Sequence, residues 1–152
     1  MVQQTPQRSS PLLIMFEKNK RRMYIAYYHR TPTPSLPVQF HSSLMITPKN
    51  PNTMDTVKQS YRYHVVDRIA PPGDKAKGYW MFDARSAYAR TSNLAGILLL
   101  GKVPQSISND DIERILRSAP MKATVSEDPS WRCRHWVWDA LTVSHGLCFD
   151  QR

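Results

Sequence analysis

The sequence predicts a single α+β domain in which a small antiparallel β-sheet packs against helices. Segments rich in aromatic and β-branched residues dominate the first two thirds of the chain, and turns rich in proline or polar residues separate them. Two segments with helical periodicity follow. The 152 residues are a usual length for one domain. We expect residues 1–12 to form a flexible N-terminal tail and residues 13–152 to form the domain.

The first two strands are predicted from aromatic content and from alternation. Residues 22–29, RMYIAYYH, favour a strand that ends at RTPTPSLP, where three prolines exclude helix and central strand. Residues 40–46, FHSSLMI, alternate so that His41 shares a face with Ser43 and Met45. The other face carries Leu44 and Ile46. His41 is therefore expected to point away from the main core.

Three further strands are predicted before the helices begin. Residues 60–67, SYRYHVVD, follow a polar connection and place His64 on a face with Arg62 and Val66. Residues 79–84, YWMFDA, follow the turn APPGDKAKG and extend the same sheet. Residues 94–104, LAGILLLGKVP, fit a buried strand or the end of a helix. We favour the strand because glycines and a proline bracket a short element.

The two helices are predicted from caps and periodicity. Residues 108–120, SNDDIERILRSAP, have Ser108 as N-cap, acidic residues in the first turn and a proline at the end. A second helix is expected after Ser130, its predicted cap, with Cys133 in the first turn and pointing inward. His135 and Asp139 are spaced for a pair across one helical turn.

Composition limits the classes of partner and the cellular compartment that we expect for this protein. The net charge of +9 and the pI near 9.8 fit an anionic partner, but the basic residues are scattered and no nucleic-acid motif accompanies them. No apolar run approaches the roughly 20 residues that a membrane helix needs. Two cysteines and five dispersed histidines lack zinc-site spacing, so we expect no metal and no cofactor. Without a secretion signal, reduced thiols and an intracellular, cytoplasmic location are expected.

The segment WRCRHWVWDAL, residues 131–141, poses the functional question. A helix N-terminus favours the thiolate form of a cysteine such as Cys133, and the strands supply His41 and His64 as candidate bases. Alternatively, Cys133 packs as a small hydrophobic residue and the histidines are ordinary strand residues. The residues alone leave both interpretations open.

Three motifs, FHSSLMI, SYRYHVVD and WRCRHWV, occur in an order that resembles the permuted papain-type thiol enzymes, the lecithin:retinol acyltransferase-like and NlpC/P60-like group. The resemblance implies a permuted papain-like arrangement with Cys133 as nucleophile, His41 as base and His64 as the residue that orients it. Arg132 and Arg134 stand where the group has asparagine and glutamate. They become candidates for binding substrate or holding a thiolate.

Most of the chain also resembles a family of small uncharacterised fungal proteins, through NKRRMYIAYY, FHSSLMITPK, RYHVVD and WRCRHWVWDAL. This second resemblance implies a stable domain and no particular activity. The resulting hypothesis is a cysteine-dependent hydrolase or acyl or amide transferase, including a cyclising one, that works through a Cys133 acyl-enzyme in small-molecule or peptide metabolism. The alternative is a noncatalytic binding or accessory protein with a basic, aromatic surface.

Overall fold

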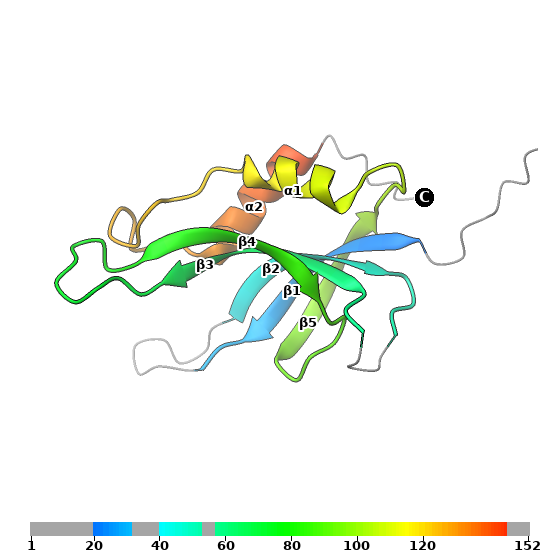
Figure 1. Cartoon of the computed structure of the whole chain (residues 1–152), viewed down its shortest axis with the longest axis horizontal. Helices are drawn as coiled ribbons and strands as arrows, with labels where there is room; N and C mark the ends of the chain where they lie inside the picture. The colour runs from blue at the N-terminus through cyan, green and yellow to red at the C-terminus, as the bar shows by residue number, and fades with distance from the viewer. Residues whose placement is uncertain (1–19, 32–39, 53–56, 146–152) are drawn as a thin grey trace, which may run out of the picture.

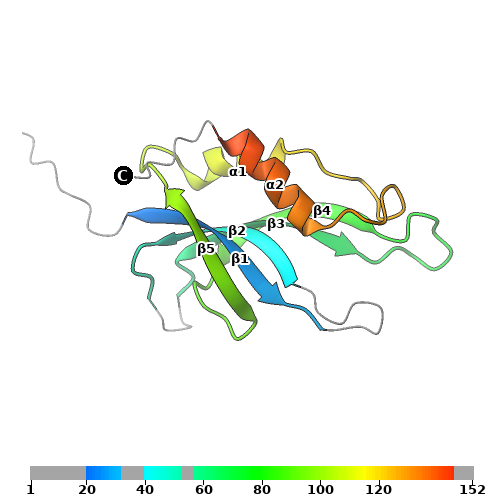
Figure 2. The same cartoon turned by 180° about the vertical axis from the view of Figure 1, so that it is seen from behind.

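A computed structural model of the chain describes residues 20–31, 40–52 and 57–145. Five strands form one antiparallel sheet in the order β4-β3-β2-β1-β5. Two helices lie side by side on one face of this sheet (Figures 1 and 2). The elements are β1 (Arg21–His29), β2 (Phe40–Pro48), β3 (Ser60–Arg68), β4 (Tyr79–Ala87), β5 (Leu94–Lys102), α1 (Asn109–Arg117) and α2 (Cys133–Ser144). The predicted α+β class is confirmed, and the predicted tail, residues 1–12, lies outside the described residues.

The main core lies between the sheet and the helices. Alternate residues of the inner strands point toward the helices and are almost fully buried. They meet Ile112 and Leu116 of α1 and Trp136 of α2, all at most 1% exposed. The strand residues of this core include Met23, Ile25, Leu44, Ile46, Tyr63 and Val65. A smaller cluster of Ala26, Tyr28 and Met45 comes from residues of the opposite parity and lies on the other face.

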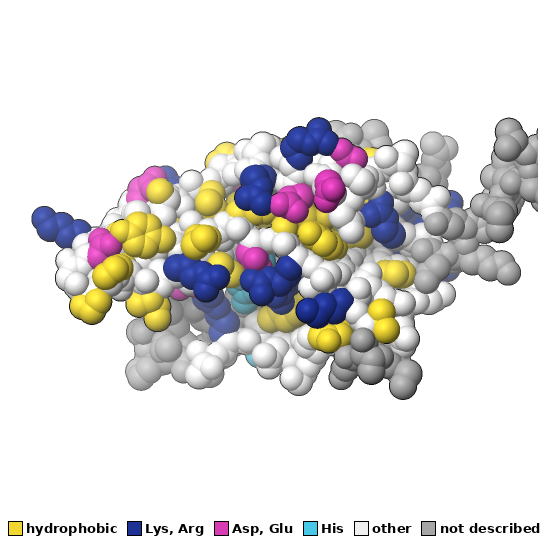
Figure 3. Space-filling view, viewed as in Figure 1, with side chains coloured by type: hydrophobic (Ala, Val, Ile, Leu, Met, Phe, Trp, Pro, Cys, Tyr) yellow, Lys and Arg dark blue, Asp and Glu magenta, His cyan; other side chains and the backbone are white. Residues whose placement is uncertain are grey.

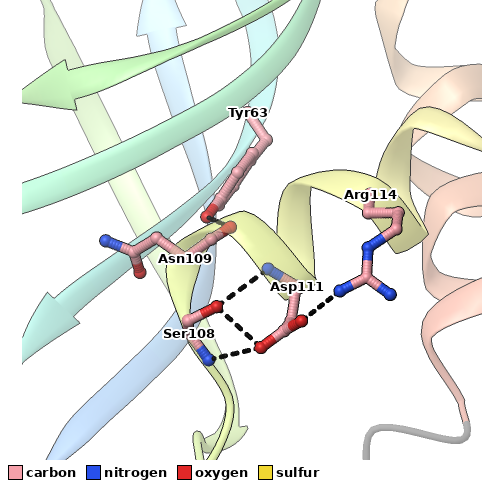
Figure 4. Close-up of polar contacts among 5 residues, drawn as sticks. All are labelled: Tyr63, Ser108, Asn109, Asp111 and Arg114. Carbon is pink, nitrogen blue, oxygen red and sulfur yellow. Dashed lines mark hydrogen bonds and ion pairs between the residues drawn. The ribbon is translucent and has the colours of Figure 1, made fainter.

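The start of α1 is fixed by the predicted cap (Figure 4). Ser108 accepts a hydrogen bond from the backbone of Asp111, and the Asp111 carboxylate accepts one from the backbone N–H of Ser108. Such a reciprocal arrangement satisfies N–H groups that have no partner within the helix. The hydroxyl of Tyr63 donates to the carbonyl of Asn109 over 3.0 Å and joins the helix to β3. The preferred strand over residues 94–104 is also confirmed, as β5.

The start of α2 differs from the prediction in its cap. The N-cap is Arg132, because the backbone and hydroxyl of Ser130 are held by Asp128 at 2.9 and 2.6 Å in the preceding turn. His135 Nδ1 accepts the N–H of Arg132 over 2.8 Å. The predicted pair of His135 with Asp139 is not formed, since no hydrogen bond or ion pair joins these two described side chains, and the His135 ring caps the helix through Nδ1. Cys133 becomes the first residue of α2.

The pairing of β2 with β3 covers only part of each strand. Residues Leu44–Ile46 pair with Tyr61–Tyr63, and no register continues from there toward the start of β2. By contrast, β2 pairs with β1 along its whole length. The sheet is thus open between the start of β2 and the end of β3, next to the N-terminus of α2. No helix of the described part is long and apolar enough to cross a membrane.

Candidate active site

Cys133 is held against the start of β2. Its side chain belongs to the main core, and the residue is 4% exposed. The thiol Sγ accepts a hydrogen bond from the backbone N–H of Ser42 over 3.4 Å. That nitrogen belongs to the peptide joining His41 to Ser42, in the stretch of β2 that has no β3 partner. The open part of the sheet therefore brings the cysteine to the peptide group beside His41.

His41 and His64 meet each other on the face of the sheet away from the helices. The strand parity predicted for His41 agrees with this, since its ring lies 6.4 Å from that of Tyr28 in the smaller cluster. His41 Nε2 and His64 Nδ1 are 2.6 Å apart. The two rings are nearly perpendicular, with centroids 4.8 Å apart. The structure thus joins two of the three residues predicted for the site by a direct hydrogen bond.

Asp83 of β4 extends this pair into a chain. Its Oδ2 lies 2.7 Å from His64 Nε2 and accepts a hydrogen bond from Arg85 Nε over 2.6 Å. β4 aligns Asp83 directly with His64 in the antiparallel register. Burial alone would raise the pKa of Asp83, but the hydrogen bonds from Arg85 and His64 outweigh it, so the pKa is lowered. At neutral pH the group is a carboxylate and can only accept.

The carboxylate determines which nitrogens carry protons. Because Asp83 only accepts, His64 Nε2 must be protonated, and Nδ1 of a neutral His64 is then an acceptor. His41 Nε2 must donate to it, which leaves Nδ1 of a neutral His41 as a free lone pair. This atom is buried and has no hydrogen-bond partner among the described residues. The chain of three residues therefore ends in a nitrogen lone pair without a hydrogen-bond partner.

Both imidazoles are neutral at physiological pH. Burial, followed by the electrostatic effect of His64, Arg30 and Arg62, lowers the pKa of His41 from 6.5 to about 3. Burial also lowers the pKa of His64 to about 4, although its hydrogen bond to Asp83 acts in the opposite direction. A neutral imidazole is the form that can accept a proton. The electrostatics therefore agree with the hydrogen-bond pattern.

A pocket of about 340 Å³ opens beside the cysteine on the helix side of the sheet. It is lined by Tyr27, Arg30, Phe40, Ser42, Arg132, Cys133, Arg134 and Trp138. Arg132 and Arg134, predicted to bind substrate, thus share a cavity with Cys133. Neither predicted histidine is among its lining residues. The thiol is reached from the pocket, whereas the His41–His64 pair lies on the other face of the sheet, and no hydrogen bond joins Sγ to either imidazole.

Sequence reasoning missed Asp83, Arg85 and the contribution of Arg30. The sequence assigns Asp83 only to a strand, because the pairing of Asp83 with His64 depends on the register between β3 and β4. An acidic residue inside an otherwise hydrophobic strand, YWMFDA, was the available signal. No group of three or more His, Cys, Asp or Glu residues suited to hold a metal ion occurs in the described part of the chain.

On the face of the molecule that Figure 3 shows, basic side chains lie at several separate places rather than in one region. On the face seen in Figure 1, lysines and arginines are interspersed with hydrophobic side chains and with a few acidic ones (Figure 3). The arginines of the pocket are distinguished by lining one cavity together with Cys133. Local geometry at the pocket is therefore more informative than net charge.

Comparison with known proteins gives the family of the chain. No curated protein and no solved structure matches it. One family model does, and it covers residues 20–146, which is most of the sequence and includes Cys133, His41, His64 and Asp83. The chain therefore belongs to DUF6914, a family of unknown function.

Proposed function

We propose that this protein is a thiol hydrolase or acyl or amide transferase with a permuted papain-like arrangement, in which Cys133 is the nucleophile. The observation that carries the proposal is the hydrogen-bonded chain from Asp83 through His64 to His41. It ends in His41 Nδ1, a buried atom without a partner among the described residues, and His41 directly precedes the residue whose backbone N–H donates to Cys133 Sγ. A nucleophile, a base and a residue that orients the base are what covalent catalysis by a thiol requires.

The proposed reaction passes through a covalent intermediate. The thiol proton moves from Sγ to His41 Nδ1 through one water molecule, because no direct hydrogen bond joins these two atoms. Sγ then forms a bond to the carbonyl carbon of an ester, thioester or amide. When the tetrahedral intermediate collapses, the bond to the leaving group breaks and His41 returns the proton to that group. Water or an amine finally cleaves the Cys133 thioester.

Two features assist these steps. His64 and Asp83 hold His41 in the tautomer that can accept a proton, as orienting groups do in other thiol and serine enzymes. The backbone N–H of His135 donates to the carbonyl of Arg132 over 2.9 Å, whereas those of Cys133 and Arg134, the first two residues of α2, have no acceptor one turn earlier in the helix. They supply hydrogen-bond donors for the negative oxygen of the tetrahedral intermediate. Side-chain substitution would leave these donors unchanged.

A second candidate function is noncatalytic binding of an anionic ligand. It is favoured by the 4% exposure of Cys133 together with the three arginines that line the adjacent pocket. On this account Cys133 is a packing residue, and the His41–His64–Asp83 chain serves stability alone. The two candidates differ in the reactivity that they predict for the thiol.

The discriminating measurement is the alkylation rate of Cys133 by iodoacetamide as a function of pH, followed by mass spectrometry with Cys148 as internal reference. The proposal expects Cys133 to be alkylated faster than Cys148 at neutral pH. It also expects His41→Ala to slow the reaction by at least about tenfold, because a general base contributes about a hundredfold or more. His145→Ala, at the exposed end of α2, is the matched control and should have no effect.

A direct test of the covalent step uses p-nitrophenyl acetate. The proposal expects an acetyl adduct on Cys133 that His41→Ala does not accumulate. A thiol that reacts no faster than Cys148 and is indifferent to His41 would contradict the enzymatic proposal. In that case the binding function would be the better account of the site.

A further inference from the structure

The charged residues that line the pocket beside Cys133 are all positive. Three of its eight lining residues are arginines, and none is acidic. Guanidinium groups are the side chains best suited to bind carboxylate and phosphate, because they donate several hydrogen bonds in a planar fork. A pocket of this composition favours an anionic ligand over a neutral one of the same shape.

The three arginines are not equivalent. Arg30 is ion-paired with Asp67 at 3.0 Å. The guanidinium of Arg132 donates to the carbonyls of Pro129 and Trp131 at 2.5 and 2.7 Å, which fixes its position. Arg134 is exposed on α2 and has no hydrogen-bond or ion-pair partner among the described residues. Arg134 is therefore the guanidinium with its donors available to a ligand.

An exposed aromatic wall lies beside Arg134. Trp138 is four residues further along α2, on the same side of the helix, and is 66% exposed. The other three tryptophans, by contrast, are at most 7% exposed. Phe40, 45% exposed, and Tyr27 line the pocket from the strands. Exposed aromatic faces in a cavity provide stacking surface for a planar group.

We propose that the pocket takes substrates in which a carboxylate or phosphate group accompanies a planar apolar group, with Arg134 binding the anion and Trp138 contacting the planar part. The inference names a substrate class and so rests on the proposed function of Cys133. The pocket itself can be tested without catalysis. Carboxylate and phosphate both accept hydrogen bonds from a guanidinium group, and the second experiment below compares their binding.

The first experiment compares two alkylating reagents of similar size on a Cys148→Ser background, which leaves one thiol. Iodoacetate is anionic and iodoacetamide is neutral. Arg134→Gln is expected to lower the iodoacetate rate by at least about threefold relative to the iodoacetamide rate, because one close positive charge is lost. Arg90→Gln, which removes one exposed positive charge elsewhere, is the control and should leave the ratio unchanged. An unchanged ratio in Arg134→Gln would overturn the role of Arg134.

The second experiment measures ligand binding without the thiol. Cys133→Ser is titrated with phenyl phosphate, benzoate and benzyl alcohol, and tryptophan fluorescence is followed. Binding of either anion, but not of the alcohol, that weakens in Arg134→Gln supports the proposal and shows which anion the site prefers. Equal binding of all three ligands, or of none, overturns it. If the anions bind but the alkylation rate of Cys133 does not depend on His41, this inference stands and the proposed catalysis is rejected.

Discussion

The buried histidine pair makes stability depend on pH in a defined window. His41 and His64 have folded-state pKa values of about 3 and about 4, both below the unfolded value of 6.5. Between these limits the unfolded chain binds more protons than the folded one, so stability is complete above pH 6.5 and is lost as the pH falls. A pH of 5 lies 1.5 units below the pKa of an imidazole in the unfolded chain. At about 1.36 kcal/mol per unit, each histidine lowers the free energy of unfolding by about 2 kcal/mol.

The prediction is tested by urea unfolding at pH 7.5 and pH 5. The unmodified protein is expected to lose roughly 4 kcal/mol more between these two pH values than the double variant His41→Gln/His64→Gln, in which neither group titrates. The single variant His41→Gln should lose an intermediate amount. His145→Gln, at the exposed end of α2, serves as the matched control and should behave as the unmodified protein. Equal losses in the unmodified protein and the double variant would refute the reasoning.

Three other predictions concern the orienting chain and the core. Asp83→Asn should reduce the His41-dependent alkylation rate of Cys133, because an amide no longer fixes the His64 tautomer. The altered tautomer should be visible by ¹⁵N NMR of the imidazoles, and an unchanged spectrum would contradict the assignment. Ser108→Ala should cost about 1 kcal/mol in urea unfolding through the lost cap, whereas Ser106→Ala, in the exposed turn before α1, should cost almost nothing. Leu116→Ala should cost about 2–5 kcal/mol, because Leu116 is fully buried between α1 and the sheet; a cost below about 1 kcal/mol would argue against that packing.

Much of the architecture could be predicted from local pattern. The five strands follow from alternation and from the prolines between them, and α1 follows from a serine cap whose partner lies three residues away. The cap of α2 could not be found in this way. Ser130 has the right residue type, but Asp128 competes for it, and a histidine caps the helix through its ring. Competition among neighbouring polar groups decides such a boundary.

The sequence predicts the residues of the site but not how they are connected. The residue types of Cys133, His41 and His64 were recognisable from short motifs. Their mutual placement depends on where β2 and β3 stop pairing, which no local pattern encodes. Asp83 reaches His64 only through the β3–β4 register, which is a property of the whole sheet. Short sequence motifs therefore identify the reactive residue types, whereas the contacts between these residues are determined by the tertiary structure.

The hydrogen bond from Ser42 to Cys133 gives the protein a built-in spectroscopic reporter. In a regular sheet an amide is protected from exchange by a neighbouring strand, but the Ser42 amide is protected by a sulfur atom. Acylation or alkylation of that sulfur changes its capacity to accept a hydrogen bond. The exchange rate and proton chemical shift of one backbone amide therefore register the covalent state of the thiol, without any label on the substrate.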